Sequence, residues 1–121
     1  MKNVSSEGAP KAIGPYSHAV ISHDLVFVSG QIGVDANGEL GDGIEEQTEN
    51  AISNISTILK AAGSSLDKVV KTTVYLTNMS DFAKMNTVYE RHFRNKPARA
   101  TVGVASLPKG AVVEIEAVAE L

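Results

Sequence analysis

Three charged residues in the C-terminal quarter of the chain, Arg99, Glu114 and Glu116, are of types that can hold an anion or move a proton. The two glutamates are two residues apart in an alternating run, so on a strand they point the same way. From these residues alone, either carboxylate fits a solvated outer face as well as a functional one. Arg99, at the start of a predicted strand, fits a structural salt bridge better than a binding site.

No familiar catalytic motif accompanies these residues. The 121 residues include no cysteine, which excludes disulfides, thiolate metal sites and cysteine nucleophiles. They also contain no P-loop, no GxGxxG segment, no HExxH pair and no calcium loop. Redox chemistry would therefore need another carrier, whereas small charged ligands remain possible.

Metal binding is not predicted either. The three histidines lie on different predicted elements without ligand spacing, which is typical of ordinary surface or half-buried residues. A group of acidic and amide side chains near residue 40 has the wrong spacing for calcium and fits a solvated hairpin turn. These residues are His18, His23 and His92, and Asp35, Asn37, Glu39 and Asp42.

Hydrophobic spacing predicts the elements of the first half of the chain. Residues 17–22 and 25–32 are rich in Val, Ile and Phe and are separated by His23-Asp24, which predicts two strands joined by a tight turn. From Ile44 to Ala62 the apolar residues recur at helical spacing, and Gly63 suits a left-handed helix C-terminus.

In the second half, alternation predicts a strand over 68–77, with one face formed by Val70, Thr72, Val74 and Leu76. A helix capped by Ser80 or Asp81 follows, with an apolar stripe of Phe82, Met85 and Tyr89, and it must end before Pro97. Two last strands, 99–106 and 111–119, are expected to pair through a turn at 107–110. That hairpin would place Arg99 near Val118, roughly 13 Å along the strand from Glu114.

This order of elements predicts an α+β domain with a sheet and two helices on one of its faces. The run 25–28, Leu-Val-Phe-Val, does not alternate, as expected for a strand buried on both faces. We therefore expect another subunit to cover the second face.

Composition bounds the class of protein. Length and an apolar fraction of 43% predict a single domain over residues 1–121. A formal net charge of −3 gives no broad basic field for nucleic acid or anionic lipid. Residues 1–10 lack the apolar centre of a signal peptide and no stretch is long enough to span a bilayer, so we expect a cytoplasmic protein.

Several motifs together resemble one known family along nearly the whole chain. They are Ala-Ile-Gly-Pro-Tyr-Ser at 12–17, Val-Ser-Gly-Gln-Ile at 28–32, Val-Lys-Thr-Thr-Val at 70–74, Asp-Phe at 81–82, Pro-Ala-Arg at 97–99, Leu-Pro-Lys-Gly at 107–110 and Val-Glu-Ile-Glu-Ala at 113–117. On these the sequence resembles the RidA (YjgF/UK114) family. The resemblance implies a chorismate-mutase-like α+β fold, a homotrimer with clefts between subunits, and 2-iminobutanoate/2-iminopropanoate deaminase activity without a cofactor.

The resemblance also implies roles for residues. Arg99 corresponds to the arginine that pairs with the substrate carboxylate, a task that its planar fork of donors suits. Glu114 corresponds to the acidic residue that positions or activates water, although periodicity does not choose between Glu114 and Glu116. Substrate contacts are implied for Tyr16, Ser29, Gly30, Asn86 and Thr101, and Thr101 replaces a cysteine of some relatives, so no property that depends on that thiol is expected.

Two alternatives to a deaminase stay open at this point. A regulatory module could hold a small 2-oxo acid in the same cleft without turnover. An RNA-binding protein or ribonuclease is the other, because residues 91–96 are locally basic, but cations are also favoured in the last turn of a helix and the whole chain is acidic. The sequence also leaves open whether Arg99 and Glu114 meet within one subunit or across an interface, and which imino acid is preferred.

Overall fold

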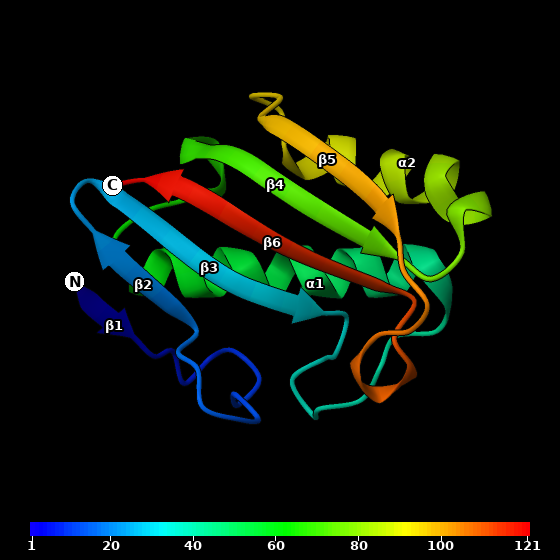
Figure 1. The fold of residues 1–121 in the computed structure, drawn as a ribbon, viewed down its shortest axis with the longest axis horizontal. Helices are drawn as coiled ribbons and strands as arrows, with labels where there is room; N and C mark the ends of the chain where they lie inside the picture. Colours follow the sequence, from blue (N-terminus) through cyan, green and yellow to red (C-terminus); the bar gives the residue numbers. More distant parts are fainter.

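The computed structural model describes all residues 1–121 as one twisted sheet with two helices behind it (Figure 1). Along the chain, the elements are β1 (Lys2–Val4), β2 (Ala19–Ser22), β3 (Leu25–Ile32), α1 (Gly43–Ala61), β4 (Val69–Leu76), α2 (Phe82–His92), β5 (Ala98–Gly103) and β6 (Val113–Glu120). Single 3-10 turns lie at Leu66–Lys68, Met79–Asp81 and Pro108–Gly110. The predicted α+β class, with both helices on one face, is confirmed.

The strand order is β1-β2-β3-β6-β4-β5, and every neighbouring pair is antiparallel except β4 and β5. The expected hairpin between the last two strands is therefore wrong. After β4 the chain crosses over through α2 and returns as a parallel β5, while β6 is inserted between β3 and β4. Strand 1 was not predicted, because three residues are too few to show alternation.

The core lies between the sheet and the helices. Buried side chains of α1 pack against alternate residues of the central strands, including Val74, Ile115 and Ala117. Gly63 has φ +87°, which confirms the predicted left-handed residue after α1. Asp81, one of the two residues expected to cap the second helix, occupies its N-cap position but makes no side-chain cap bond. The Asn78 side chain instead accepts a bond from the Ser80 N–H in the preceding 3-10 turn.

One residue of the predicted β4 face points the other way. Thr72, Val74 and Leu76 are buried as expected, but Val70 is 41% exposed and Val69 is buried instead. The cause is a register shift against β6 between Val69 and Lys71, which inverts the alternation there.

The face of the sheet opposite the helices, here called the open face, has no cover within the chain (Figure 1). Phe27, in the run expected to be buried on both sides, is 44% exposed on this face, while its neighbours Val26 and Val28 are buried. The alternate residues of β6 that carry Glu114 and Glu116 also lie on the open face, since Val113 and Ile115 are buried. No helix is both long and apolar enough to cross a membrane.

Candidate functional site

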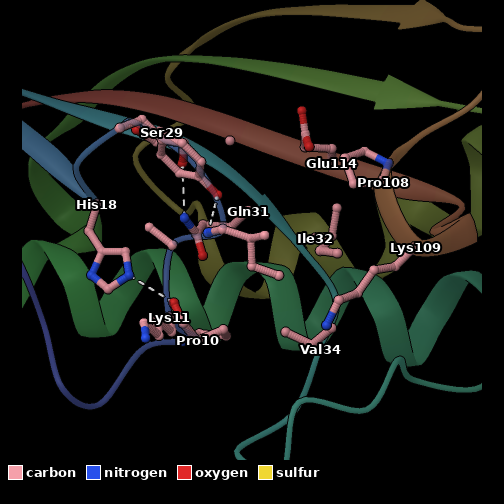
Figure 2. Close-up of a pocket in the computed structure, with 14 residues that line it drawn as sticks. Pro10, Lys11, His18, Ser29, Gln31, Ile32, Val34, Pro108, Lys109 and Glu114 are labelled. Carbon is pink, nitrogen blue, oxygen red and sulfur yellow. Dashed lines mark hydrogen bonds between the residues drawn. The ribbon is translucent and has the colours of Figure 1, made fainter.

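Four of the seven residues to which the sequence analysis gave site roles line one cavity of about 580 Å³ beside the end of β3. They are Tyr16, Ser29, Gly30 and Glu114. Figure 2 shows the wall formed by β3, with Glu114 on the neighbouring β6 and Lys109 in the turn before it. Apolar side chains such as Ile13, Ile32 and Val34 complete much of the lining. We call this the carboxylate half of the site.

The N-terminal segment forms the other wall and is fastened by a buried histidine. The Nδ1 atom of His18 accepts a bond from the Ser6 N–H at 3.0 Å. Its Nε2–H donates to the Pro10 carbonyl at 2.8 Å (Figure 2). Ser29 ties β3 to the same segment, because its hydroxyl donates to the Ser17 carbonyl at 2.6 Å. These bonds hold the loop that carries the half-exposed Tyr16 against the sheet.

Glu114 lies against the one part of β3 where no side chain intervenes. The register between β3 and β6 is irregular from Val28 to Gln31, and Gly30 lies in this stretch. A Cβ added at Gly30 would stand 2.8 Å from Oε2 of Glu114, so the glycine creates the space for this carboxylate. Burial raises the pKa of Glu114 above its ordinary value, and the negative charge of Glu116 raises it further.

The structure distinguishes the two glutamates that periodicity could not. Glu114 lines the cavity, and its carboxylate has no hydrogen-bond partner within the chain. Glu116 does not line the cavity. The hydroxyl of Tyr75 on β4 donates to Oε1 of Glu116 at 2.6 Å. Of the two, Glu114 is therefore the carboxylate that is free to contact a ligand in the cavity.

Arg99 lies elsewhere, on the helix side of the edge strand β5. Its guanidinium carbon is 4.7 Å from the ring centroid of Tyr89 and 5.5 Å from that of Phe82, both on α2. The salt bridge that the bare sequence favoured for Arg99 is absent, since the chain's single ion pair joins His92 to Glu49. Aromatic faces attract the cation without occupying its N–H donors, so these donors remain available to an anion.

The aromatic support of Arg99 is itself anchored. The Tyr89 hydroxyl and the Thr72 hydroxyl, both buried, are 2.7 Å apart and share a hydrogen bond. Burial raises the pKa of Tyr89 above its ordinary value, while the bond to Thr72 and the charge of Arg99 act in the opposite direction. The ring that carries the guanidinium is therefore fixed by β4 beneath it.

Two more of the predicted residues accompany Arg99. The side-chain oxygens Oδ1 of Asn86 and Oγ1 of Thr101 are the two buried side-chain polar atoms of the chain that have no hydrogen-bond partner. Asn86 lies one turn from both Phe82 and Tyr89 on α2, and Thr101 follows Arg99 on the same side of β5. Buried polar atoms without partners are rare in folded proteins. We call Asn86, Arg99 and Thr101 the arginine half of the site.

The two halves are not in contact within one chain. Arg99 is paired with Thr72 of β4, which faces the helices, whereas Glu114 is paired with Tyr75 on the open face. The two side chains therefore leave opposite faces of the sheet, with β4 between their strands. The distance expected along a hairpin therefore does not apply, because β5 and β6 are not paired with each other.

Sequence reasoning missed the side chains that support the site. Phe82 and Tyr89 were expected only as an apolar helix stripe, although two aromatic residues before an arginine strand are also what a stacked guanidinium needs. Tyr75 and His18 carried no signal beyond their types. No three His, Asp or Glu side chains converge as metal ligands would.

Fold and site together define a small α+β protein with an unpaired arginine in one polar cluster and a half-buried carboxylate in another. Residues 6–121 match the Endoribonuclease L-PSP family. The 2-iminobutanoate/2-iminopropanoate deaminase of Homo sapiens is 49% identical over 119 residues, which are 96% of this chain and 87% of that protein.

Solved structures agree with this match. The crystal structure of RidA from the Antarctic bacterium Psychrobacter sp. has a TM-score of 0.96 at 45% identity and covers all of both chains. That of E. coli TdcF with bound serine has a TM-score of 0.95 at 39% identity, covering 100% of this chain and 99% of that one. The chain therefore belongs to the RidA family, which carries the endoribonuclease L-PSP description, and the resemblance seen in the sequence is confirmed.

Proposed function

We propose that this protein is a deaminase that hydrolyses small 2-imino acids to 2-oxo acids and ammonia, in a site that two copies of the chain build together. The observation that carries the proposal is the arginine half: an unpaired guanidinium on an aromatic support beside two buried polar atoms without partners. A carboxylate supplies what this cluster lacks, because it accepts two parallel bonds from one guanidinium.

The neighbours of Arg99 fit the rest of such a substrate. Oγ1 of Thr101 can donate to a carboxylate oxygen, and Oδ1 of Asn86 can accept a bond from an imine N–H. TdcF with bound serine, at 39% identity, supports a ligand of this size that carries an acid group and a nitrogen. The deaminase relative at 49% identity supports an imine as the group that reacts.

Glu114 supplies the proton transfers. Water adds to the carbon of the protonated C=N bond and gives one proton to the Glu114 carboxylate. The carboxyl then protonates the nitrogen, and the C–N bond breaks with its electron pair leaving on ammonia. The hydroxyl proton returns to Glu114 as the carbonyl forms, and passes on to the ammonia. No step needs a metal or an organic cofactor.

A homotrimer is the assembly that we propose for joining the halves. In a ring of three, the arginine half of each subunit meets the carboxylate half of the next, so three equivalent sites form. The exposed Phe27 on the open face and Val102 on β5, 44% and 41% exposed, would be covered in such a ring. Light scattering behind a size-exclusion column tests this directly, and a monomer in solution would contradict it.

The decisive experiment mixes two inactive variants. Arg99→Ala lacks the carboxylate-binding group and Glu114→Gln lacks the proton carrier, so each alone should lose the acceleration of ammonia release from freshly generated 2-iminobutanoate. When the two are co-refolded in equal amounts, about a quarter of the sites should combine an intact Arg99 with an intact Glu114. Activity near a quarter of wild type supports a site shared between subunits, and no recovery refutes it.

The same assay separates the deaminase from its alternatives. A binding module would hold 2-oxobutanoate but would not accelerate ammonia release. A ribonuclease, which the family description and the exposed Arg91 and Arg94 favour, would cleave RNA with a steep salt dependence and would lose activity when these two arginines are replaced. We expect neither result.

A further inference from the structure

We infer that Glu116, held in place by Tyr75, is a positioning residue whose negative charge acts on Glu114 during the proposed proton transfers. The inference rests on the proposed function, since it assigns a catalytic task to two residues, Tyr75 and Glu116, that belong to neither half of the site. It also explains why a second carboxylate stands beside the one that lines the cavity.

Three ionisable side chains lie next to one another on the open face. Glu114 and Glu116 are alternate residues of β6, and Tyr75 is directly opposite Glu114 on β4. The Tyr75 hydroxyl does not bond to Glu114, its partner in the strand register, but donates to Oε1 of Glu116 at 2.6 Å. The tyrosine thereby fixes the position of one carboxylate and leaves the other without a donor.

A hydrogen bond of this kind favours the ionised form of its acceptor. The bond to Glu116 is the largest cause that raises the pKa of Tyr75 above its ordinary value, so the hydroxyl keeps its proton and remains a donor. Glu116 is thus a fixed negative charge about 7 Å along the strand from Glu114. Within the chain, no Lys, Arg or His lies within 4.0 Å of either carboxylate. In the proposed trimer the neighbouring subunit adds its Arg99 to the site, where that guanidinium binds the carboxylate of the substrate.

Other charged or titratable groups surround Glu114 at longer range. The segment of β3 packed against it, Ser29 and Gly30, has none. The open face of β4 carries one cation in addition to the neutral Tyr75. The remaining charged or titratable groups come from the loops that line the cavity. They are Lys71 on β4, and Lys11, Tyr16, His18 and Lys109 in the loops. Because none is paired with Glu114, the adjacent Glu116 is the nearest fixed charge on its own strand.

This charge matters because the proposed reaction uses Glu114 in both protonation states. As a carboxylate it accepts the proton of the attacking water, and as a carboxylic acid it protonates the departing nitrogen. A carboxyl group with an ordinary pKa would be a weak acid catalyst at pH 7, since almost none of it is protonated. Burial raises the pKa of Glu114 above its ordinary value and the Glu116 charge raises it further, which is the direction that makes the carboxylic acid form easier to reach.

The test is a titration of the side-chain carboxyl carbons by NMR in the full-length protein, with Glu116→Gln compared to wild type. Removing a charge at about 7 Å should lower the titration midpoint of Glu114 by about half a pH unit or more, even at the screening of bulk water. Glu120→Gln is the matched control. It removes the same charge from the same strand, six residues from Glu114, and should leave the midpoint unchanged.

Activity gives the second readout. In Glu116→Gln the acid limb of the kcat/KM profile should move to lower pH by the amount seen in the titration, with the effect on kcat larger than on KM. Tyr75→Phe, which keeps the ring and its packing, releases Glu116 from its donor and should shift the Glu114 midpoint in the same direction as Glu116→Gln but by less.

The outcomes separate this inference from the proposed function. An active enzyme whose Glu114 midpoint is the same in wild type and both variants overturns the inference alone. A wild-type protein without deaminase activity overturns the proposed function and, with it, the catalytic task of Glu116. A lowered Glu114 midpoint together with a shifted activity profile supports both.

Discussion

Replacing Arg99 is the perturbation whose size can be worked out most fully from the structure. A charge-assisted hydrogen bond contributes about 1.5–3 kcal/mol, so losing a fork of two such bonds costs about 3 kcal/mol or more. Arg99→Ala should therefore lower kcat/KM for 2-iminobutanoate by roughly 150-fold or more. Arg99→Lys keeps the charge but only one well-aligned bond, so its loss should be about tenfold.

The fold should survive both changes. Arg99 makes no ion pair, so its removal leaves no buried charge unpaired, and what is lost is stacking on Phe82 and Tyr89. Contacts of a cation with an aromatic ring contribute about 0.5–1 kcal/mol each at partly exposed sites, which limits the destabilisation of Arg99→Ala to about 2 kcal/mol. Urea denaturation measures this separately from activity.

Arg94→Ala is the matched control, because Arg94 is exposed and has no hydrogen-bond or ion-pair partner. Ammonia release by this variant should equal that of wild type. The reasoning fails if Arg99→Lys is as active as wild type, since a point charge would then suffice. It fails equally if Arg99→Ala still accelerates release while remaining folded.

Four further changes test other parts of the structure. The pKa of Glu114 is raised above 4.5 in the folded state, so the native protein binds this proton more tightly than the unfolded chain does. The free energy of unfolding therefore falls as pH rises from about 4.5 through the raised value. Glu114→Gln should be more stable to urea than wild type at pH 8 and equal to it at pH 4. Gly30→Ala puts a Cβ 2.8 Å from the flexible carboxylate end of Glu114, so it should lower kcat/KM about 100-fold with an unchanged thermal midpoint. Gly33→Ala meets the backbone carbonyl of Gln47 on α1 at 2.2 Å, and denaturant titration should show a loss of about 3 kcal/mol or more. Tyr89→Phe keeps the ring under the guanidinium but leaves a buried threonine hydroxyl unpaired, so stability should fall by about 1–3 kcal/mol while KM rises less than in a Tyr89→Leu variant.

Much of the fold could be predicted because its elements carry strong local patterns. The nineteen residues of α1 repeat their apolar positions over five turns and end near a glycine in the left-handed conformation. What failed were the features decided at long range. The pairing of β5 with β4 instead of β6 depends on the crossover through α2, and a short turn between two strands in the sequence gave the opposite expectation.

For the site, too, some features could be predicted from the sequence and others could not. All seven residues carried over from the family pattern lie in one of the two halves: Tyr16, Ser29, Gly30 and Glu114 at the cavity, and Asn86, Arg99 and Thr101 in the arginine half. Their roles remain proposals. That the halves leave opposite faces of the sheet could not be foreseen, because the side on which Arg99 emerges is set by its partner in β4 rather than by its own strand.

Each half of the site is also formed by its own segments of the sequence. Within the chain, the side chains described around the guanidinium come from one uninterrupted stretch, from Thr72 to Thr101, which contains β4, α2 and β5. The cavity with its carboxylate is assembled from the first 34 residues and from the turn and strand that follow β5. Under the proposed function, changes in the central stretch would alter how firmly the acid group of the substrate is bound, whereas changes in residues 1–34 and 108–114 would alter which substrate side chains fit and how fast the substrate reacts.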